Sequence, residues 1–272
     1  MTELETFIAA QTNKTISVAV HDFETGNEIF INADEAFHPA STIKVHVMME
    51  VFHQAEKGLL TLEGCLPIVN SFTSIADGSP FSLLQSDDAE QTLYPRLGEH
   101  ESIAELTRLM IVHSSNLATN ILLEKIRATN VNDFIRALGI DGVAFVRGIE
   151  DNAAFRLGMN NSATARGLTQ TMRLIAEKKV VSPQASERMI EILLGQEFNE
   201  SIPAGLPGSL KVAHKTGWTG DVYHDTGIVY AERERRSPYA ISIMTRGFAE
   251  NQEAQAHACM AHISKLIYEQ LQ

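Results

Sequence analysis

The sequence predicts an α/β fold of the α+β type, in which strands from both ends of the chain form one antiparallel sheet flanked by helices. Alternating apolar and polar residues occur near the N-terminus and again after residue 208, and the stretch between these regions has apolar residues at helical spacing. A sheet made from both chain ends requires the middle of the chain to leave the sheet and return. We therefore expect a discontinuous sheet domain, residues 1–38 and 208–272, and an inserted all-helical domain, residues 39–207.

Two strands are predicted near the N-terminus. In residues 15–23, Ile16, Val18 and Val20 alternate with smaller or polar residues, which is the pattern of a strand with one buried face. Turn formers at 24–27 then lead into a second strand at 28–32, so the two strands form a hairpin.

The next predicted element is a helix that begins at Ser41 and ends at Gly58. Apolar residues cover most of its circumference, which is typical of a buried helix. Ser41 and Lys44 are three residues apart, so the hydroxyl and the amine lie on one face within reach of each other. Burial disfavours the charged form of an unpaired ammonium, and a neutral amine beside a hydroxyl is a general base beside a nucleophile. A lone Ser-x-x-Lys sequence, however, also occurs by chance in many helices.

The remaining elements follow from turn formers, caps and periodicity. Residues 67–98 are rich in turn formers and predict an insertion that borders the site, in which Phe72, Phe81 and Tyr94 either line a pocket or fix the insertion to the core. A capping box at Ser102 begins a helix. The predicted helices after Gly58 are 102–112, one from 114 or 115 onward, one that Gly139 ends, 162–179, 183–194 and 253–271, and the late strands are 210–216, 226–231 and 239–245.

Two further short motifs follow Ser41 and Lys44 in order along the chain. They are Ser114-Ser115-Asn116, which comes after a helix, and Lys215-Thr216-Gly217, which lies on a late strand. With Ser-x-x-Lys they resemble the S-x-x-K, S-D-N and K-T-G signatures of class A β-lactamases and penicillin-binding proteins. The resemblance runs from about Ile16 to the C-terminal helix. It implies the serine β-lactamase/DD-peptidase fold, with the active site at the seam of the two domains.

The resemblance divides one acyl-transfer reaction among these residues. Ser41 would attack a carbonyl, Lys44 would accept its proton, and Ser114 would pass a proton to the leaving nitrogen. Asn116 would hold the substrate amide. The backbone amides of Ser41 and Trp218 would form the oxyanion hole, while the Trp218 ring is expected to pack at the core or the rim.

The Lys-Thr-Gly motif is assigned by the resemblance to a substrate carboxylate. Lys215 would supply positive charge, Thr216 would offer a hydroxyl, and Gly217 would let the substrate lie close against the strand. Many relatives add an arginine beside this strand, whereas the matching place here holds Asp225. Arg246 is a candidate replacement, although a solvated arginine at a strand end is the more common case.

Deacylation in class A enzymes depends on a loop glutamate, and Glu150 lies roughly where the resemblance places it. The surrounding pattern is partly kept, because Arg147 is one residue too far from Glu150 and Asn152 is too close. Asn161 stands about where relatives have the aspartate that closes the loop. Glu150 is therefore either the base that activates water or a solvated surface carboxylate. Ser115 in place of the S-D-N aspartate is interpreted as a tolerated variant.

Composition and charge argue against several other classes of function. The chain has 272 residues and a formal net charge of −12, with basic residues scattered except in a charged turn at 233–236, so nucleic acid and anionic membranes are poor partners. Neither the ten histidines nor the two cysteines show metal-ligand spacing, and the reaction implies no metal and no cofactor. Cys65 and Cys259 are expected to be free buried thiols.

The N-terminal residues have neither a basic start nor a long apolar run, so neither a signal peptide nor a membrane span is predicted. We expect a cytoplasmic protein, with a periplasmic or secreted location as the alternative if an export signal has been removed. The expected partner is a small-molecule substrate, and no obligate protein partner is evident.

Three functions fit these residues. The leading one is a β-lactamase, in which Ser41 is acylated and Glu150 or Lys44 then activates water. The second is an esterase or D-alanyl peptidase of the same fold, which the missing arginine and the altered loop favour. The third is a penicillin-binding sensor that is acylated without turnover.

Overall fold

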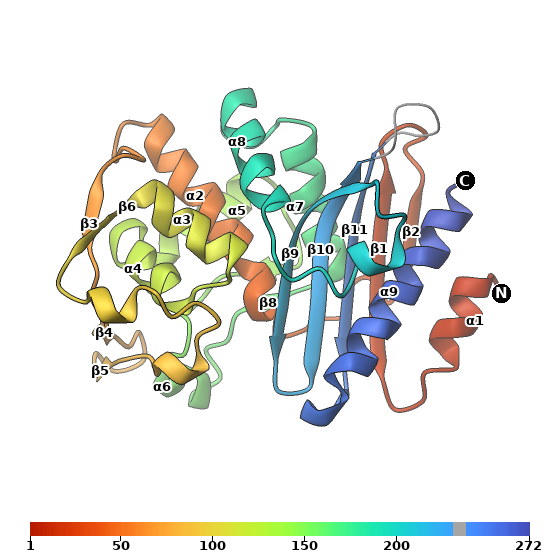
Figure 1. Ribbon diagram of the computed structural model, residues 1–272, viewed down its shortest axis with the longest axis horizontal. Coiled ribbons are helices and arrows are strands. Elements are labelled where there is room, and N and C mark those ends of the chain that lie inside the picture. Colours follow the sequence, from red (N-terminus) through yellow and green to blue (C-terminus); the bar gives the residue numbers. More distant parts are fainter. Residues whose placement is uncertain (231–237) are drawn as a thin grey trace.

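The computed structural model describes residues 1–230 and 238–272 of the chain. Within them, one sheet of five antiparallel strands (Figure 1) has the order β2 (Glu28–Ile31), β1 (Thr15–Asp22), β11 (Tyr239–Arg246), β10 (Val222–Tyr230) and β9 (Lys211–Thr219). The antiparallel sheet predicted from both chain ends is confirmed, because β1 pairs with β11 along its whole length. The domain boundaries at 38/39 and 207/208 stay a prediction.

Helices cover both faces of this sheet, and a further group of helices lies beyond β9 (Figure 1). Across the described residues the helices are α1 (Glu3–Ala9), α2 (Lys44–Glu56), α3 (Ile103–Val112), α4 (Asn116–Ile126), α5 (Ala128–Ala137), α6 (Asn152–Arg156), α7 (Ala165–Ala176), α8 (Pro183–Leu194) and α9 (Glu253–Gln270). Short strands pair locally, as β3 (Cys65–Pro67) with β6 (His100–Ser102), β4 (Phe72–Thr73) with β5 (Pro80–Phe81), and β7 (Val143–Ala144) with β8 (Ser162–Ala163).

Helix α7 is shorter than the helix predicted at 162–179. The Thr164 side chain accepts a hydrogen bond from the Gly167 amide and caps the helix, so the helix begins at Ala165. The two residues before Thr164 belong to β8 instead, because they pair with β7.

Strand β1 is buried on both faces, although the sequence predicts one buried face. Val18 and Val20 pack with residues of α1 and α9. On the opposite face Ala19 packs with Leu168 of α7, and Ser17 donates a hydrogen bond to a backbone carbonyl. Small and polar residues there leave room for α7, which is why the pattern resembles that of a solvent-facing surface.

Helix α2 runs through the helical group and is apolar on nearly every side. Its apolar residues from Val45 to Phe52 are all buried, which confirms the predicted buried helix. The chain enters α2 through a 3₁₀ turn (Ala40–Ile43) that carries Ser41. The Ser-x-x-Lys pair therefore straddles the junction between this turn and the α-helix.

The 67–98 segment forms an insertion against the helical group. The rings of Phe72 and Phe81 meet across the β4–β5 hairpin with their centroids 5.7 Å apart. Phe72 and Tyr94 are buried in the core of the helical group, so these rings fix the segment to the core.

Cys259 is buried and Cys65 is exposed, and both are free thiols. The expectation of a buried thiol is therefore wrong for Cys65, which begins β3, a short strand paired only with β6 among the described residues. No described helix combines the length and the apolar character that crossing a membrane requires. The charged turn at 233–236 and the predicted end of a strand at residue 231 lie outside the described residues.

Candidate active site

Ser41 lies where the 3₁₀ turn before α2 meets the edge strand β9. A Cβ atom added to Gly217 would lie 2.6 Å from the backbone nitrogen of Ser41 and 2.8 Å from that of Thr42. Only glycine therefore lets β9 approach the turn this closely. The prediction that Gly217 lets a substrate lie close against the strand stays a prediction, and the glycine has a second reason in the backbone around Ser41.

The amine of Lys44 is fully buried and is held by the loop between α3 and α4. Its Nζ donates hydrogen bonds to the carbonyl oxygen of Ser114 at 2.6 Å and to Oδ1 of Asn116 at 2.7 Å, and Oγ of Ser114 lies 3.4 Å away. The first and second motifs are thus joined directly. The sequence predicted contact between Lys44 and Ser41, whereas the amine bonds to the second motif.

The surroundings of Lys44 make its amine easier to deprotonate than that of an exposed lysine. Burial lowers the pKa of Lys44 to about 8, although the carboxylates of Asp88 and Glu150 oppose this shift. Burial, followed by the nearby charge of Lys44, also lowers the pKa of Lys215 well below its usual value. A base is therefore available near neutral pH, and a substrate carboxylate bound beside Lys215 would favour the charged form of that amine.

Three residues around the site have left-handed backbone conformations. The φ angles are 46° at Ala40, 59° at Ser114 and 60° at Glu150. Such conformations cost non-glycine residues roughly 1–3 kcal/mol each, and they persist where the surrounding structure holds them. The nucleophile turn, the second motif and the glutamate loop each contain one of these strained positions.

Glu150 lies inside the site. Its Oε1 accepts a hydrogen bond from Nδ2 of Asn116 at 2.9 Å, so Asn116 bridges Glu150 and Lys44. Burial raises the pKa of Glu150, against the opposing effects of the Asn116 hydrogen bond and the charge of Lys44. The carboxylate also lines a cavity that Ser41 borders.

The loop that carries Glu150 is closed by an amide side chain. Oδ1 of Asn161 accepts hydrogen bonds from the backbone amides of Val146 at 2.7 Å and Arg147 at 3.0 Å. Nδ2 of Asn161 donates to the Arg147 carbonyl at 3.0 Å. Three hydrogen bonds thus hold the loop where relatives use an aspartate.

Two residues that the sequence analysis missed hold the loop on either side of Glu150. Asn120 accepts from the amide of Ile149 and donates to its carbonyl, both at 2.9 Å. Asp151 accepts hydrogen bonds from Ser74 Oγ at 2.7 Å and from the Ile75 amide at 3.0 Å, which ties the loop to the 67–98 segment.

One of these two anchors had a signal in the sequence. Asn120 lies one helical turn after Asn116 on α4, so the two amides share a face. Asp151 and its partner Ser74 are 77 residues apart, and no local pattern connects them.

Thr216 and Trp218 lie on β9 beside the nucleophile. Oγ1 of Thr216 is buried and has no hydrogen-bond partner among the described residues, so it is available to a bound group. Lys215 Nζ donates to the Thr216 carbonyl at 2.9 Å. Trp218 is 36% exposed and meets Phe198 edge to face at 5.1 Å, so its ring packs at the rim.

The place of the arginine beside β9 is occupied by Asp225, which is buried and hydrogen bonded. Asp225 accepts hydrogen bonds from Nδ1 of His214 at 2.9 Å and from the Ile202 amide at 3.0 Å. Arg246 lies at the surface, where it pairs with Glu35 at 3.0 Å. It is thus the solvated arginine that its position at a strand end suggests.

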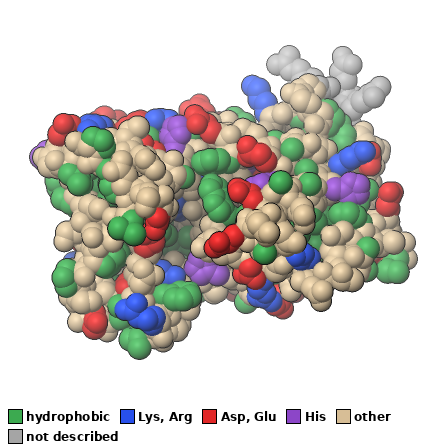
Figure 2. Space-filling view, turned by 60° about the horizontal axis from the view of Figure 1, so that its bottom comes forward, with side chains coloured by type: hydrophobic (Ala, Val, Ile, Leu, Met, Phe, Trp, Pro, Cys, Tyr) green, Lys and Arg blue, Asp and Glu red, His purple; other side chains and the backbone are tan. Residues whose placement is uncertain are grey.

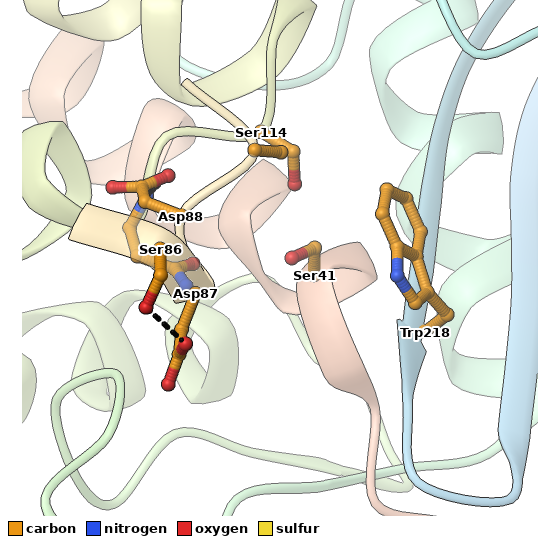
Figure 3. Close-up of a pocket in the computed structure, with 8 residues that line it drawn as sticks. Ser41, Ser86, Asp87, Asp88, Ser114 and Trp218 are labelled. Atoms are coloured by element: carbon orange, nitrogen blue, oxygen red, sulfur yellow. Dashed lines mark hydrogen bonds between the residues drawn. The ribbon is translucent and has the colours of Figure 1, made fainter. Parts of the chain in front are cut away.

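Two cavities meet at Ser41, and the surface is hollowed between the two halves of the molecule (Figure 2). Figure 3 shows Ser41 and Ser114 between Asp87 and Asp88 on one side and the Trp218 indole on the other. The smaller cavity, about 220 Å³, is lined by Ser41, Ser86, Asp87, Asp88, Ala89, Ser114, Asn116 and Trp218. The larger cavity, about 620 Å³, has residues of the glutamate loop and of the β9–β10 turn in its wall.

Comparison with known proteins identifies relatives along the whole chain. A family model described as the beta-lactamase enzyme family matches residues 1–271. The extended-spectrum β-lactamase PER-1 of Pseudomonas aeruginosa is 24% identical over 267 residues, which cover 94% of this chain and 82% of the relative. The carbapenem-hydrolyzing β-lactamase KPC of Klebsiella oxytoca is 24% identical over 265 residues, covering 94% and 84%.

Solved structures with the same fold include class A β-lactamases and the protein PBP-A. A mutant of PBP-A, described as an acyl-enzyme complex with penicillin G, has a TM-score of 0.82 at 21% identity and covers 99% of this chain and 94% of that one. A class A β-lactamase from Mycobacterium abscessus has a TM-score of 0.83 at 18% identity, and the match covers 99% of this chain and 98% of that one. The predicted fold is confirmed.

Replacing Gly217 by alanine should destabilise the protein. The added methyl group would collide with backbone atoms that cannot rotate away, so we expect Gly217→Ala to lower the free energy of unfolding by about 1–3 kcal/mol in urea titrations. The matched control is Gly208→Ala, because a Cβ at Gly208 meets nothing within 4 Å. Equal stability of the two variants would contradict the close approach of β9.

Proposed function

The chain belongs to the β-lactamase enzyme family, and we propose that it is a serine hydrolase that cleaves the amide of β-lactam rings through an acyl-enzyme on Ser41. One observation carries the proposal, namely that the three motifs contact one another beside a cavity that Ser41, Ser114 and Asn116 line. Lys44 bonds to both Ser114 and Asn116, and Gly217 contacts the backbone of Ser41. A β-lactam is the small-molecule substrate that this family implies.

Acylation begins with attack of Ser41 Oγ on the lactam carbonyl carbon. Neutral Lys44 takes the hydroxyl proton, and its lowered pKa supports this role. The backbone amides of Ser41 and Trp218 stabilise the developing oxyanion. The carbon–nitrogen bond of the lactam then breaks. Ser114, whose Oγ lies 3.4 Å from Lys44 Nζ, passes a proton to the leaving nitrogen.

The substrate carboxylate binds at β9. The unpaired hydroxyl of Thr216 donates to it, and the anion favours the charged form of Lys215. Asn116, which lines the same cavity as Ser41, holds the side-chain amide of the substrate.

Deacylation requires a water molecule that attacks the ester carbonyl. Glu150 takes a proton from this water, the bond from Ser41 Oγ to the carbonyl carbon breaks, and the serine regains a proton. The place of Glu150 supports this role, because its carboxylate lines the same cavity as Ser41 and is oriented by Asn116. Burial raises its pKa, which strengthens it as a base.

A second function is hydrolysis of a small ester or a linear D-alanyl peptide by the same residues. The observation that favours it is Asp225, which stands where relatives have an arginine and is engaged by His214 and Ile202. A substrate whose binding needs no arginine for its carboxylate would fit a site with Asp225 at this position.

Intact-protein mass spectrometry with a chromogenic cephalosporin tests the proposed function. We expect a transient adduct, sustained colour, and a loss of turnover of roughly 1,000-fold or more in Ser41→Ala, because this variant has no nucleophile. The exposed Ser209→Ala is the matched control and should behave as the wild type. Retained hydrolysis in Ser41→Ala would contradict the nucleophile assignment. A permanent adduct after one turnover would indicate the sensor, and absence of an adduct would favour esters or D-alanyl peptides.

Glu150→Gln should separate the two half-reactions. Glutamine cannot take a proton from water, so the variant should be acylated at a rate within a few-fold of wild type and should then accumulate the adduct. Time-resolved mass spectra provide the measurement, with the exposed Glu191→Gln on α8 as the control. Unchanged turnover in Glu150→Gln would mean that another group, such as Lys44, activates the water.

A further inference from the structure

Asp88 is a buried carboxylate to which the mechanism above gives no role. It follows the 3₁₀ turn Gln85–Asp87 of the 67–98 segment and is only 3% exposed. Its Oδ1 accepts from the amides of Asn116 at 2.9 Å and Glu90 at 3.2 Å. Its Oδ2 accepts from the amide of Leu117 at 2.9 Å and from the Tyr94 hydroxyl at 3.1 Å. Each of these hydrogen bonds is donated to the carboxylate of Asp88.

Two of these donors are the first two amides of helix α4. The first amides of a helix have no partner inside it, and the positive end of the helix dipole favours an anion there. Ser115 is the N-cap residue, and its hydroxyl accepts from the third amide, that of Ala118. The amides of Asn116 and Leu117 are therefore held from outside, by a residue 28 positions earlier than Asn116.

The start of α4 in turn holds the amine of Lys44. Both short hydrogen bonds of Nζ end on this loop, at the Ser114 carbonyl and at Oδ1 of Asn116. Ser114 is in the left-handed conformation, which a free loop would relax. Asp88 holds the amide of Asn116, two residues after Ser114, and this clamp opposes the relaxation.

Charge links Asp88 to Lys44 as well, but it favours the protonated amine and so acts on the pH range of the base. The carboxylates that act on Lys44 are Asp88 and Glu150, which favour its charged form. The other charged group nearby is Lys215, whose pKa the charge of Lys44 lowers. The effect of Asp88 on the pKa of Lys44 exceeds that of Glu150. Asp88 therefore bears on both the position and the proton affinity of the base.

We propose that Asp88 is the positioning residue of this active site, because its carboxylate clamps the 114–116 loop against Lys44 and so sets the rate at which Ser41 is acylated. Asp88 borders the smaller cavity, but its carboxylate bonds to protein donors and acts through the loop. The inference rests on the proposed function, since its readout is acylation of Ser41.

The test is the second-order acylation rate constant of Asp88→Asn with a chromogenic cephalosporin, followed by stopped flow across pH. An asparagine keeps the size of the side chain but replaces one acceptor oxygen by a donor and removes the charge. We expect acylation to slow by roughly 10-fold or more at its plateau. The midpoint of the acid limb should also move to lower pH, because an ammonium without this carboxylate loses its proton more readily.

The matched control is Asp77→Asn, which removes a carboxylate from the same segment. Asp77 is exposed and hydrogen bonds to the Ser79 amide, so acylation should stay within about 2-fold of wild type with the same midpoint. A lower melting temperature of Asp88→Asn with an unmoved midpoint would reduce Asp88 to a structural cap and overturn the proposal. Acylation equal to wild type would overturn it as well.

Asp88→Glu keeps the test decisive if Asp88→Asn does not fold. Its charge is retained but displaced by one methylene, so acylation should fall by roughly 10-fold while the midpoint stays near that of wild type. Wild-type acylation in Asp88→Glu would overturn the proposal. Failure of the wild-type protein itself to be acylated would instead overturn the proposed function, and the inference with it.

Discussion

A buried lysine amine is the group on which the rest of this site depends. Lys44 is removed from water, so its amine needs oxygen acceptors from the protein, and the Ser114 carbonyl and Asn116 Oδ1 provide them. That requirement fixes the loop between α3 and α4. The same burial lowers the pKa of Lys44 to about 8, so the cost of burying the amine is also what makes it a usable base.

The site combines backbone strain with neighbours that hold it in place. Ser114 and Glu150 both have positive φ angles, and each is fixed by contacts from a different part of the chain. Asp88 holds the amide of Asn116, two residues after Ser114. On either side of Glu150, Asn120 holds Ile149, and Asp151 binds the 67–98 segment. Strained positions persist only when the surroundings determine them in this way. The 67–98 segment is thus part of the active-site framework.

The sequence predicted the architecture and the motif residues because their signals are local. Period-two and helical patterns lie within one element, and each motif spans at most four residues, as Ser41 and Lys44 illustrate. Asp88 and Asp151 were missed, because each acts on atoms far along the chain and an aspartate in a turn-rich segment has many ordinary roles. The second reason for Gly217 was also missed, since it concerns the distance between two elements.

Acylation as proposed depends on neutral Lys44, which accepts the proton of Ser41. The pH dependence of the second-order acylation rate constant of the wild-type enzyme tests this role, because it reports groups of the free enzyme. We expect acylation to rise with pH through a single acid limb with its midpoint near 8, the pKa that burial gives Lys44. An acid limb well below neutrality would contradict this role and would indicate a carboxylate such as Glu150 as the base in acylation.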